Sequence, residues 1–407
     1  MDKKRIIYIA IFSIISIVLA YLLYRVFFAA PNNQTTAPPN KTASTTTDGQ
    51  QQFPQSGQGN QTGSIALPGT LPNAPGRRPG QASNLPEPIV QTVIKDPVVG
   101  ARVSQNGSLN YYNQLDGKFY RIGSDGTPQL LSDTVFYNVQ KVTWSPTKNA
   151  SILEYPDGSK IFYDFDTKKQ TTLPKYWEQF SFAAQGEKIA AKSLGFSPEN
   201  RWLVTANPDG SNTTLVAALG DNADKVTVNW SPNQQIVGTS LTGQSLGGDR
   251  QEVLFVGLRG ENFKSTIVEG RDLRSLWSTD GKKLLYSVYS AQNNYKPGLW
   301  VVNAEGDAIG SGRKFLNVST WADKCSFSNP KTVFCGVPTS LDSGAGFAPS
   351  LANTTPDVLV KIDVETGAQT IIPMPESHII DTINVSPDGQ KLFFTDKQKA
   401  GIFSVDL

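Results

Sequence analysis

The chain has 407 residues, of which 37 are basic and 35 acidic, giving a formal net charge of +2. Such a balanced surface has no basic stripe, so nucleic acid is not an expected partner. With one histidine and two cysteines, the sequence lacks the ligands of an ordinary zinc centre, and we expect neither a metal nor another cofactor.

The N-terminus predicts a membrane anchor. Residues 1–5 form a short basic tail, and an apolar run over residues 6–24 is long enough, at about 1.5 Å per residue, to cross a hydrocarbon core of roughly 30 Å. A cleaved signal peptide is the alternative, but its apolar core is usually about 7 to 15 residues long. The positive-inside rule leaves the tail in the cytoplasm. Residues 6–28 are thus predicted to be a single-pass signal anchor in the cytoplasmic membrane, with the rest periplasmic or at the cell surface.

Residues 29–87 have the composition of a linker. Pro, Gly, Gln, Asn, Thr and Ser dominate this segment, and apolar residues almost never cluster in it. A chain of this composition buries too little apolar surface to offset its ordering entropy. We therefore predict a disordered tether between the anchor and the folded part.

Residues 88–407 repeat one hairpin pattern, which is clearest from Trp277 to Gly306. An apolar run ends at Trp277-Ser278, turn residues follow through Gly281, and a second run rich in β-branched and aromatic residues begins. The pattern returns about every 40 to 50 residues, the spacing of propeller blades. Its seven copies lie at Val103, Trp144, Phe182, Trp230, Trp277, Phe327 and Val385.

The fold class predicted from these repeats is an all-β propeller of seven four-stranded blades. Phe196-Ser197-Pro198 also resembles the hairpin pattern, so six or eight blades are the alternatives. In the last copy of the pattern, the sequence ends after the third strand. Because propellers usually close by pairing strands from both termini, Ile89 to Ile94 is the expected outer strand of the last blade.

The segments WSPTKN, WSPNQQ, WSTDGKKLLY and VSPDGQKLFF resemble the Trp/Phe-Ser-Pro-Asp-Gly-Lys repeat of TolB-like propellers, which are similar to WD-repeat proteins. The resemblance covers roughly Val98 to Leu407 and implies the propeller fold. It is not specific for function, because similar repeats occur in periplasmic scaffolds, peptidase propellers and surface proteins.

Long connections predict which face of the propeller binds a ligand. Four consecutive blades have extended loops between their second and third strands, at 193–200, 242–250, 290–297 and 338–356. Loops longer than a connection requires are often functional. The predicted contact residues on this face lie in these loops or in the crossovers between blades, and they are Trp177, Arg250, Tyr295, Phe347 and His378.

Two further patterns concern covalent chemistry. Gly243 to Gly247 matches the G-x-S-x-G motif of hydrolases, but it lies between two strands and not at a strand-to-helix turn, so Ser245 is not expected to be catalytic. Cys325 and Cys335 flank one hairpin nearly opposite each other, a spacing that a disulfide can bridge. Outside the cytoplasm the bond should form, with two buried thiols as the alternative.

Together these features predict a membrane-tethered, extracytoplasmic propeller that binds or scaffolds a protein, a peptide or a cell-envelope glycan. No set of catalytic residues stands out. The competing hypothesis is a propeller hydrolase or lyase that acts on envelope polysaccharide, for which two carboxylates should converge at the mouth of the central channel.

Overall fold

The computed structural model describes residues 16–19, 90–123 and 125–407. The chain divides into two compact units, residues 1–81 and 82–407. In the first unit residues 16–19 are helical, whereas the rest of the predicted tail, anchor and linker lies outside the described residues. Among the residues described, no helix has the length and apolar character needed to cross a membrane.

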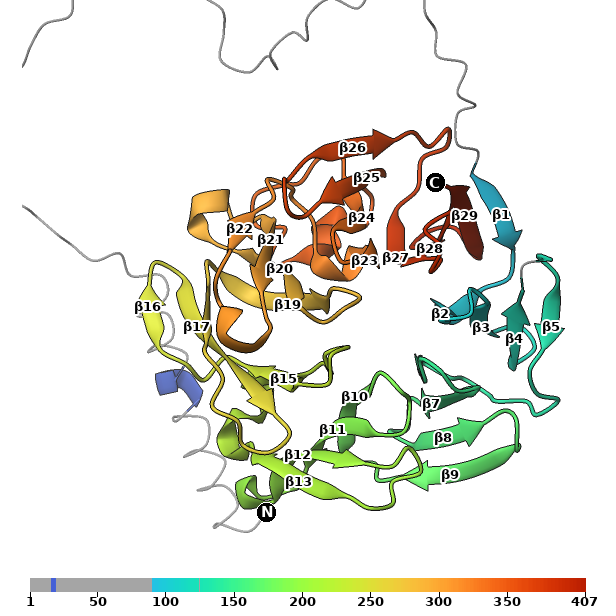
Figure 1. Cartoon of the computed structure of the whole chain (residues 1–407), viewed down its shortest axis with the longest axis horizontal. Helices are drawn as coiled ribbons and strands as arrows, with labels where there is room; N and C mark the ends of the chain where they lie inside the picture. Colours follow the sequence, from blue (N-terminus) through green and yellow to red (C-terminus); the bar gives the residue numbers. More distant parts are fainter. Residues whose placement is uncertain (1–15, 20–89, 124) are drawn as a thin grey trace, which may run out of the picture. The chain divides into compact units, whose positions relative to one another are not determined.

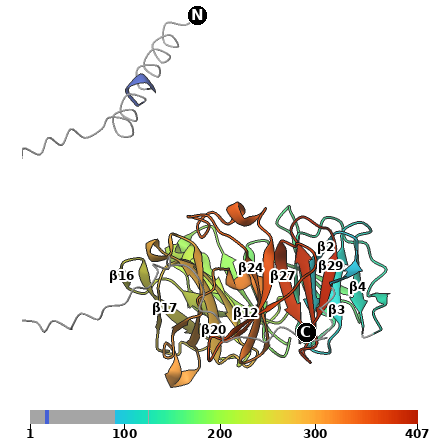
Figure 2. The ribbon, with the colours of Figure 1, turned by 90° about the horizontal axis from the view of Figure 1, so that it is seen from above.

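The second unit is a β-propeller whose seven sheets surround a central axis (Figure 1). Turned by 90°, the same unit is seen from the side of the ring (Figure 2). First strands of neighbouring blades contact one another at most of the junctions. Blades 1 to 3 are built from β2 (Val98–Val103), β3 (Leu109–Asn113), β4 (Lys118–Ile122) and β5 (Pro128–Leu130); β6 (Lys141–Trp144), β7 (Ala150–Glu154), β8 (Lys160–Asp164) and β9 (Lys169–Leu173); and β10 (Trp177–Phe182), β11 (Ile189–Leu194), β12 (Arg201–Ala206) and β13 (Thr214–Ala218).

The remaining blades follow the same antiparallel order, with one extra strand in blade 4. Blades 4 to 7 are built from β14 (Val226–Val228), β15 (Ile236–Ser240), β16 (Ser245–Gly247), β17 (Arg250–Gly257) and β18 (Thr266–Val268); β19 (Arg271–Trp277), β20 (Lys283–Tyr289), β21 (Pro297–Asn303) and β22 (Lys314–Phe315); β23 (Cys325–Asn329), β24 (Thr332–Pro338), β25 (Asp357–Asp363) and β26 (Gln369–Ile372); and β27 (Ile380–Val385), β28 (Lys391–Asp396), β29 (Ile402–Asp406) and β1 (Gln91–Ile94). The extra strand β16 pairs with β17 and lengthens the connection between the second and third strands.

Seven blades are confirmed, and the alternatives of six and eight are excluded. Phe196 lies in the connection between β11 and β12, and Pro198 begins a short 3₁₀ turn, η1 (Pro198–Asn200), so this second copy of the hairpin pattern starts no blade. The predicted closure is also found, because β1 pairs with β29 in antiparallel register, with Thr92 opposite Phe403. The ring is thus closed by strands from the two ends of the propeller unit (Figure 1).

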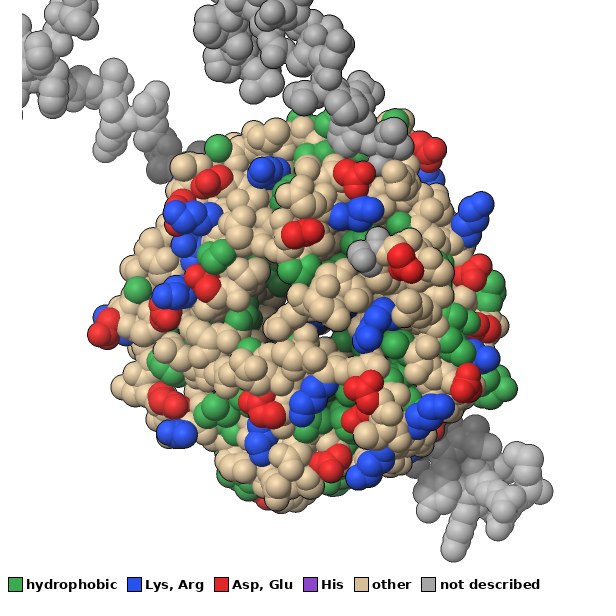
Figure 3. Space-filling view, turned by 45° about the vertical axis from the view of Figure 1, so that its right-hand side comes forward, with side chains coloured by type: hydrophobic (Ala, Val, Ile, Leu, Met, Phe, Trp, Pro, Cys, Tyr) green, Lys and Arg blue, Asp and Glu red, His purple; other side chains and the backbone are tan. Residues whose placement is uncertain are grey.

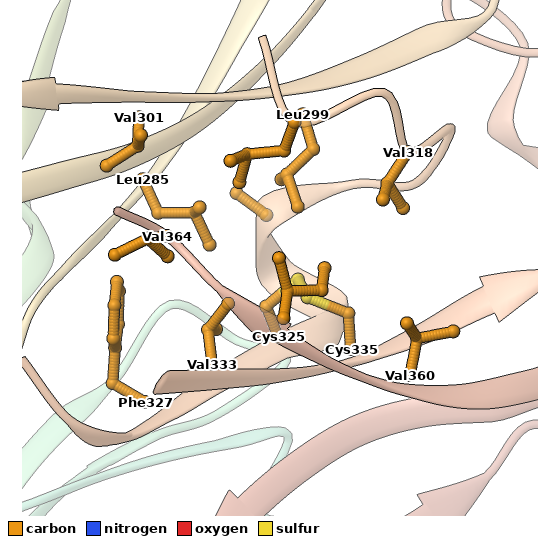
Figure 4. Close-up of a cluster of buried hydrophobic side chains, with 13 residues drawn as sticks. Leu285, Leu299, Val301, Val318, Cys325, Phe327, Val333, Cys335, Val360 and Val364 are labelled. Carbon is orange, nitrogen blue, oxygen red and sulfur yellow. A yellow bond between two sulfur atoms is a disulfide. The ribbon is translucent and has the colours of Figure 1, made fainter. Parts of the chain in front are cut away.

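The hydrophobic core consists of layers between adjacent blades. The layer between blades 5 and 6 contains Leu285 and Leu299 from one blade and Phe327 and Val333 from the next (Figure 4). Equivalent clusters fill the other interfaces between neighbouring blades. Since each sheet buries its faces against two neighbours, no blade could bury them alone.

The repeat signature has a structural role. The Ser278 hydroxyl donates to Asp280 Oδ1 at 2.7 Å and accepts from the Lys283 backbone N–H at 2.9 Å, while Gly281 takes the left-handed φ of 71° that the turn requires. The indole N–H of Trp277 donates to the Asn229 carbonyl oxygen at 3.0 Å. This buried residue therefore ties its blade to the end of the inner strand of the preceding one.

Cys325 and Cys335 are directly opposite each other on β23 and β24 and are joined by a disulfide in the blade 5–6 layer (Figure 4). Both residues are buried among aliphatic side chains. The bond closes a short hairpin loop, so the stabilisation expected from loop closure is smaller than for a bond between distant segments.

Candidate functional site

The strand order separates the propeller into two faces. One, which we call the turn face, has the tight turns between first and second and between third and fourth strands. The other, which we call the loop face, has the connections between second and third strands together with the crossovers between blades. The longest connections between second and third strands lie in blades 3 to 6, at 195–200, 241–249, 290–296 and 339–356, as the sequence predicted.

The long loops of the loop face are connected to one another. In blade 4, Asp249 accepts a hydrogen bond from the Ala291 backbone N–H of blade 5 at 3.3 Å and pairs with Arg271 at 2.8 Å. In blade 6, Asn353 accepts from the Lys397 ammonium of blade 7 at 2.9 Å. These contacts order the face, so a ligand would meet a largely preformed surface.

An aromatic cluster joins the loops of blades 5 and 6. Tyr289, Tyr295 and Phe347 pack edge to face, with ring centroids 5.9 to 6.5 Å apart. The Gly346 N–H donates to the Tyr295 carbonyl oxygen at 2.7 Å, and a Cβ at residue 346 would lie 2.3 Å from Tyr289 Cβ. Gly346 is thus required for the close approach, and Tyr295 and Phe347 present part of their rings to solvent.

A pocket of about 830 Å³ lies beside this cluster, between blades 4 and 5. We call it the blade 4–5 pocket. Its walls come from the β16–β17 hairpin, the 290–293 segment and the outer strands of blade 5. The lining residues with polar or aromatic side chains are Arg250, Glu269, Ser290, Gln292, Asn293, Trp300 and Phe315.

The five predicted contact residues are divided between interior and surface. Arg250, Tyr295 and Phe347 are exposed on the loop face, and Arg250 lines the blade 4–5 pocket. Trp177 and His378 are only 4% and 1% exposed. Trp177 packs in the blade 2–3 core layer, so neither buried side chain is available for direct contact with a ligand at the surface.

His378 is a buried structural residue of blade 7. Its Nδ1 lies 3.0 Å from Asp396 Oδ2, and its ring packs against Phe394 and Phe403. Burial lowers the pKa of His378 despite the opposing effect of Asp396. For Asp396, burial alone would raise the pKa, but hydrogen bonds from the backbone of Gln398, Lys399 and Ile379 outweigh it and lower the pKa.

We expect the stability of the propeller to fall as the pH drops below about 6.5, because His378 is then protonated in the unfolded chain before it is protonated in the folded one. The folded state binds fewer protons in this window, so its stability rises with pH, by at most about 1.4 kcal/mol per pH unit. The contribution of Asp396 is lost only below about pH 4. Urea midpoints of the wild type and His378→Gln between pH 5 and 7.5 test this. Equal pH slopes in both proteins would contradict it.

A buried ion pair that sequence reasoning missed lies under the loop face. The Lys324 ammonium is 2.6 and 2.7 Å from the two carboxylate oxygens of Asp357, and Asp357 also accepts from the Ile380 backbone N–H at 2.7 Å. Burial lowers the pKa of Lys324 and raises that of Asp357, while the contact between them opposes both shifts. Lys324 and Asp357 both belong to blade 6, and the hydrogen bond from Ile380 joins Asp357 to blade 7. No spacing in the sequence pointed to the ion pair, because the partners are 33 residues apart.

Exposed apolar side chains gather on the loop face. Among the described residues of the propeller, every exposed large hydrophobic side chain outside a strand lies in a loop or crossover of this face. These residues are Leu115, Val135, Tyr137, Tyr176, Phe196, Tyr295, Phe347 and Leu351. Phe196 is fully exposed and Tyr137 is 77% exposed. Because they are restricted to one face, and Tyr295 and Phe347 are in contact, this face is the better candidate for an interaction surface.

Charged groups show no comparable concentration. Basic and acidic side chains alternate over the surface seen in Figure 3, which is hollowed near the centre of the ring. Among the described residues, no three His, Cys, Asp or Glu side chains lie close enough together to hold a metal ion. Ser245, in the G-x-S-x-G segment, is exposed on β16 in blade 4. His378 is buried in blade 7, so the two residues do not form a catalytic pair.

Neither a protein-family profile nor any curated protein sequence matches the chain. Solved structures match its fold. An oligogalacturonate lyase in complex with manganese superposes with a TM-score of 0.54 at 13% identity, covering 78% of this chain and 93% of the other. A chain of the mitotic checkpoint complex gives 0.52 at 12% identity, covering 85% and 99%. Kuenenia stuttgartiensis hydrazine synthase gives 0.50 at 12% identity, covering 82% and 99%. At these identities the likeness shows the fold alone.

Proposed function

We propose that this protein is a membrane-tethered, extracytoplasmic binding module whose loop face docks a protein or peptide partner. The observation that carries the proposal is the restriction of exposed apolar loop side chains to that face. The opposite face includes tight polar turns such as Ser278 to Gly281, whose side chains are used in local hydrogen bonds. A closed ring of rigid sheets with one apolar face fits a scaffold.

The tether is part of the same proposal. The apolar run over residues 6–24 would hold the chain in the cytoplasmic membrane, and the linker over residues 29–87 would let the propeller reach a partner at a distance. The repeat resemblance to TolB-like propellers is compatible with this location, since similar repeats occur in periplasmic scaffolds and surface proteins.

Charged substitutions on the loop face are expected to abolish partner binding. We expect Phe196→Asp combined with Tyr137→Asp to reduce capture of the cross-linked partner at least tenfold, since each places a charge in the apolar face. Matched controls are Leu215→Asp and Ile371→Asp, which are exposed on the outer strands β13 and β26. In-cell cross-linking followed by quantitative mass spectrometry measures the effect. Equal losses in both pairs, or none in either, would contradict the choice of face.

A propeller-type hydrolase or lyase acting on envelope polysaccharide is the second candidate. Its support is the fold likeness to a protein described as an oligogalacturonate lyase in complex with manganese. Incubating the full-length chain with acidic and neutral polysaccharides, with and without Mn²⁺, tests this candidate. New chain ends that form in proportion to enzyme concentration would favour the enzyme, whereas intact polymer would leave the binding module as the function.

A further inference from the structure

We infer that the blade 4–5 pocket is a binding site for an acidic saccharide, separate from the protein-docking function proposed for the loop face. Its volume of about 830 Å³ lies in the range of small-molecule sites. Four segments form it, namely the β16–β17 hairpin, the blade 4–5 crossover, the 290–293 segment and the outer part of blade 5. The site thus exists only when the two blades are assembled.

Hydrogen-bond donors and an aromatic ring converge on the floor of the pocket at Gly298. A Cβ placed there would lie 3.1 Å from the Phe315 ring, 3.4 Å from Asn293 Nδ2 and 3.7 Å from Trp300 Nε1. No acceptor in the described part of the chain takes the hydrogen of Trp300 Nε1. The ring and the two N–H groups thus lie close over Gly298, where a side chain would crowd them. Asn293 Nδ2 uses one of its two hydrogens for the Lys296 carbonyl oxygen at 3.2 Å, so the other is left for a ligand.

The aromatic wall is held rigid from behind. Trp300 packs against Phe315 with ring centroids 5.0 Å apart, and Tyr286 stacks parallel to Trp300 at 6.3 Å and an interplanar angle of 10°. Tyr286 is fully buried, whereas Phe315 on the edge strand β22 is partly exposed. Rings fixed in this way offer apolar faces to a ligand at little cost in side-chain entropy.

The charge of the pocket favours an anion. The guanidinium of Arg250 donates to the Leu246 carbonyl oxygen at 3.2 Å, which holds it at the pocket wall. Among the described residues no carboxylate lies within ion-pair distance of it, while Glu269, the acidic group of the lining, is paired with Arg313 at 2.9 Å. Arg250 is thus the charged residue of the lining that is free to pair with a ligand. Its planar guanidinium is suited to binding a carboxylate.

These groups together select the ligand class. Apolar ring faces suit the C–H faces of a pyranose, while Asn293, Gln292 and Ser290 provide donors and acceptors for its hydroxyl groups. The guanidinium adds selectivity for a sugar that carries a carboxylate. A purely apolar ligand would leave these polar groups without partners, which costs free energy.

Calorimetric titration of the full-length chain in detergent with an alginate hexasaccharide, a chain of uronate sugars, tests the inference. Maltohexaose is the neutral comparison. We expect the uronate to bind at least tenfold more tightly than maltohexaose, and Arg250→Gln to remove that preference. The matched control is Arg259→Gln, an exposed arginine in the blade 4 turn on the opposite face, which should change nothing.

Gly298→Val tests the site by filling it, and it should abolish binding of both saccharides. If this variant fails to fold, Arg250→Gln still tests the inference, because the Arg250 side chain is exposed and its replacement should not disturb folding. Equal affinity for the two saccharides, or an equal loss in Arg259→Gln and Arg250→Gln, would overturn the inference. Phe196→Asp with Tyr137→Asp should retain saccharide binding, so failure of the protein-docking proposal and failure of this one can be told apart.

Discussion

Replacing Asp357 by leucine is expected to destabilise the propeller by about 3 to 5 kcal/mol, because the change leaves the Lys324 ammonium buried without its counter-charge. Both side chains are almost completely shielded from water, at 8% and 0% exposure. The change also removes the acceptor for the Ile380 N–H at the start of the inner strand of blade 7. The urea midpoint of the propeller unit, residues 82–407, measures the effect.

The double variant Lys324→Met with Asp357→Leu should recover much of that loss. Replacing a buried ion pair by apolar side chains of similar size is often neutral or stabilising, since the desolvation penalty disappears with the charges. The exposed pair of Lys391 and Asp406, 3.6 Å apart, provides the matched control. Asp406→Leu should shift stability by no more than about 1 kcal/mol. A single variant at Asp357 that behaves like this control would contradict the role of the buried pair.

Replacing the closing strand Gln91–Ile94 by Gly-Ser-Gly-Ser is expected to destabilise the propeller by about 3 to 5 kcal/mol. Each backbone hydrogen bond to β29 contributes about 1 kcal/mol net, and Val93 and Ile94, which pack against the blade 7–1 core layer, add roughly 1 to 2 kcal/mol each when buried. The loss would also expose an unpaired edge of β29, so the variant should self-associate.

Urea unfolding and light scattering of the strand variant measure these two effects. Thr92→Val is the matched control, because valine keeps the strand propensity and the pairing of Thr92 with Phe403 while changing one exposed side chain. A replacement variant that stays monomeric with an unchanged midpoint would show that seven blades hold together without this closure.

The two effects have a common origin in the construction of the ring. Each blade is stabilised by packing on its neighbours, so a defect at one junction lowers the stability of the whole closed ring. The Lys324–Asp357 pair lies at the junction of blades 6 and 7, and β1 completes blade 7 with the chain segment that leads into blade 1. A closed and rigid ring allows the loop face to keep a fixed arrangement of side chains for binding.

Much of the architecture could be predicted from local patterns. The apolar runs around Trp277 and the turn chemistry of Ser278 to Gly281 are recognisable within a few residues, because a strand and a tight turn depend on neighbours in sequence. The closing strand also followed, since the last hairpin lacked a fourth strand. The long loop predicted over residues 338–356 was recognisable because it exceeded what a connection requires.

The composition of the site was not predictable in the same way. Trp177 and His378 were expected at the surface, since both lie in or beside crossovers, yet stacking of adjacent blades buries them. The blade 4–5 pocket combines Arg250 from a hairpin with Trp300 from the third strand of the next blade, 50 positions later. No local sequence pattern indicates that two residues so far apart lie in the same pocket.

The amino-acid order alone therefore settled the fold class, the closing strand and the face with long loops, because each follows from periodicity, turn chemistry or loop length. It favoured seven blades, and the structure excluded six and eight. Which side chains are buried, which lie free at the surface and which converge on Gly298 was decided by the packing of one blade on the next. That packing is made of contacts between residues far apart in the sequence, and their geometry exists only in the assembled ring.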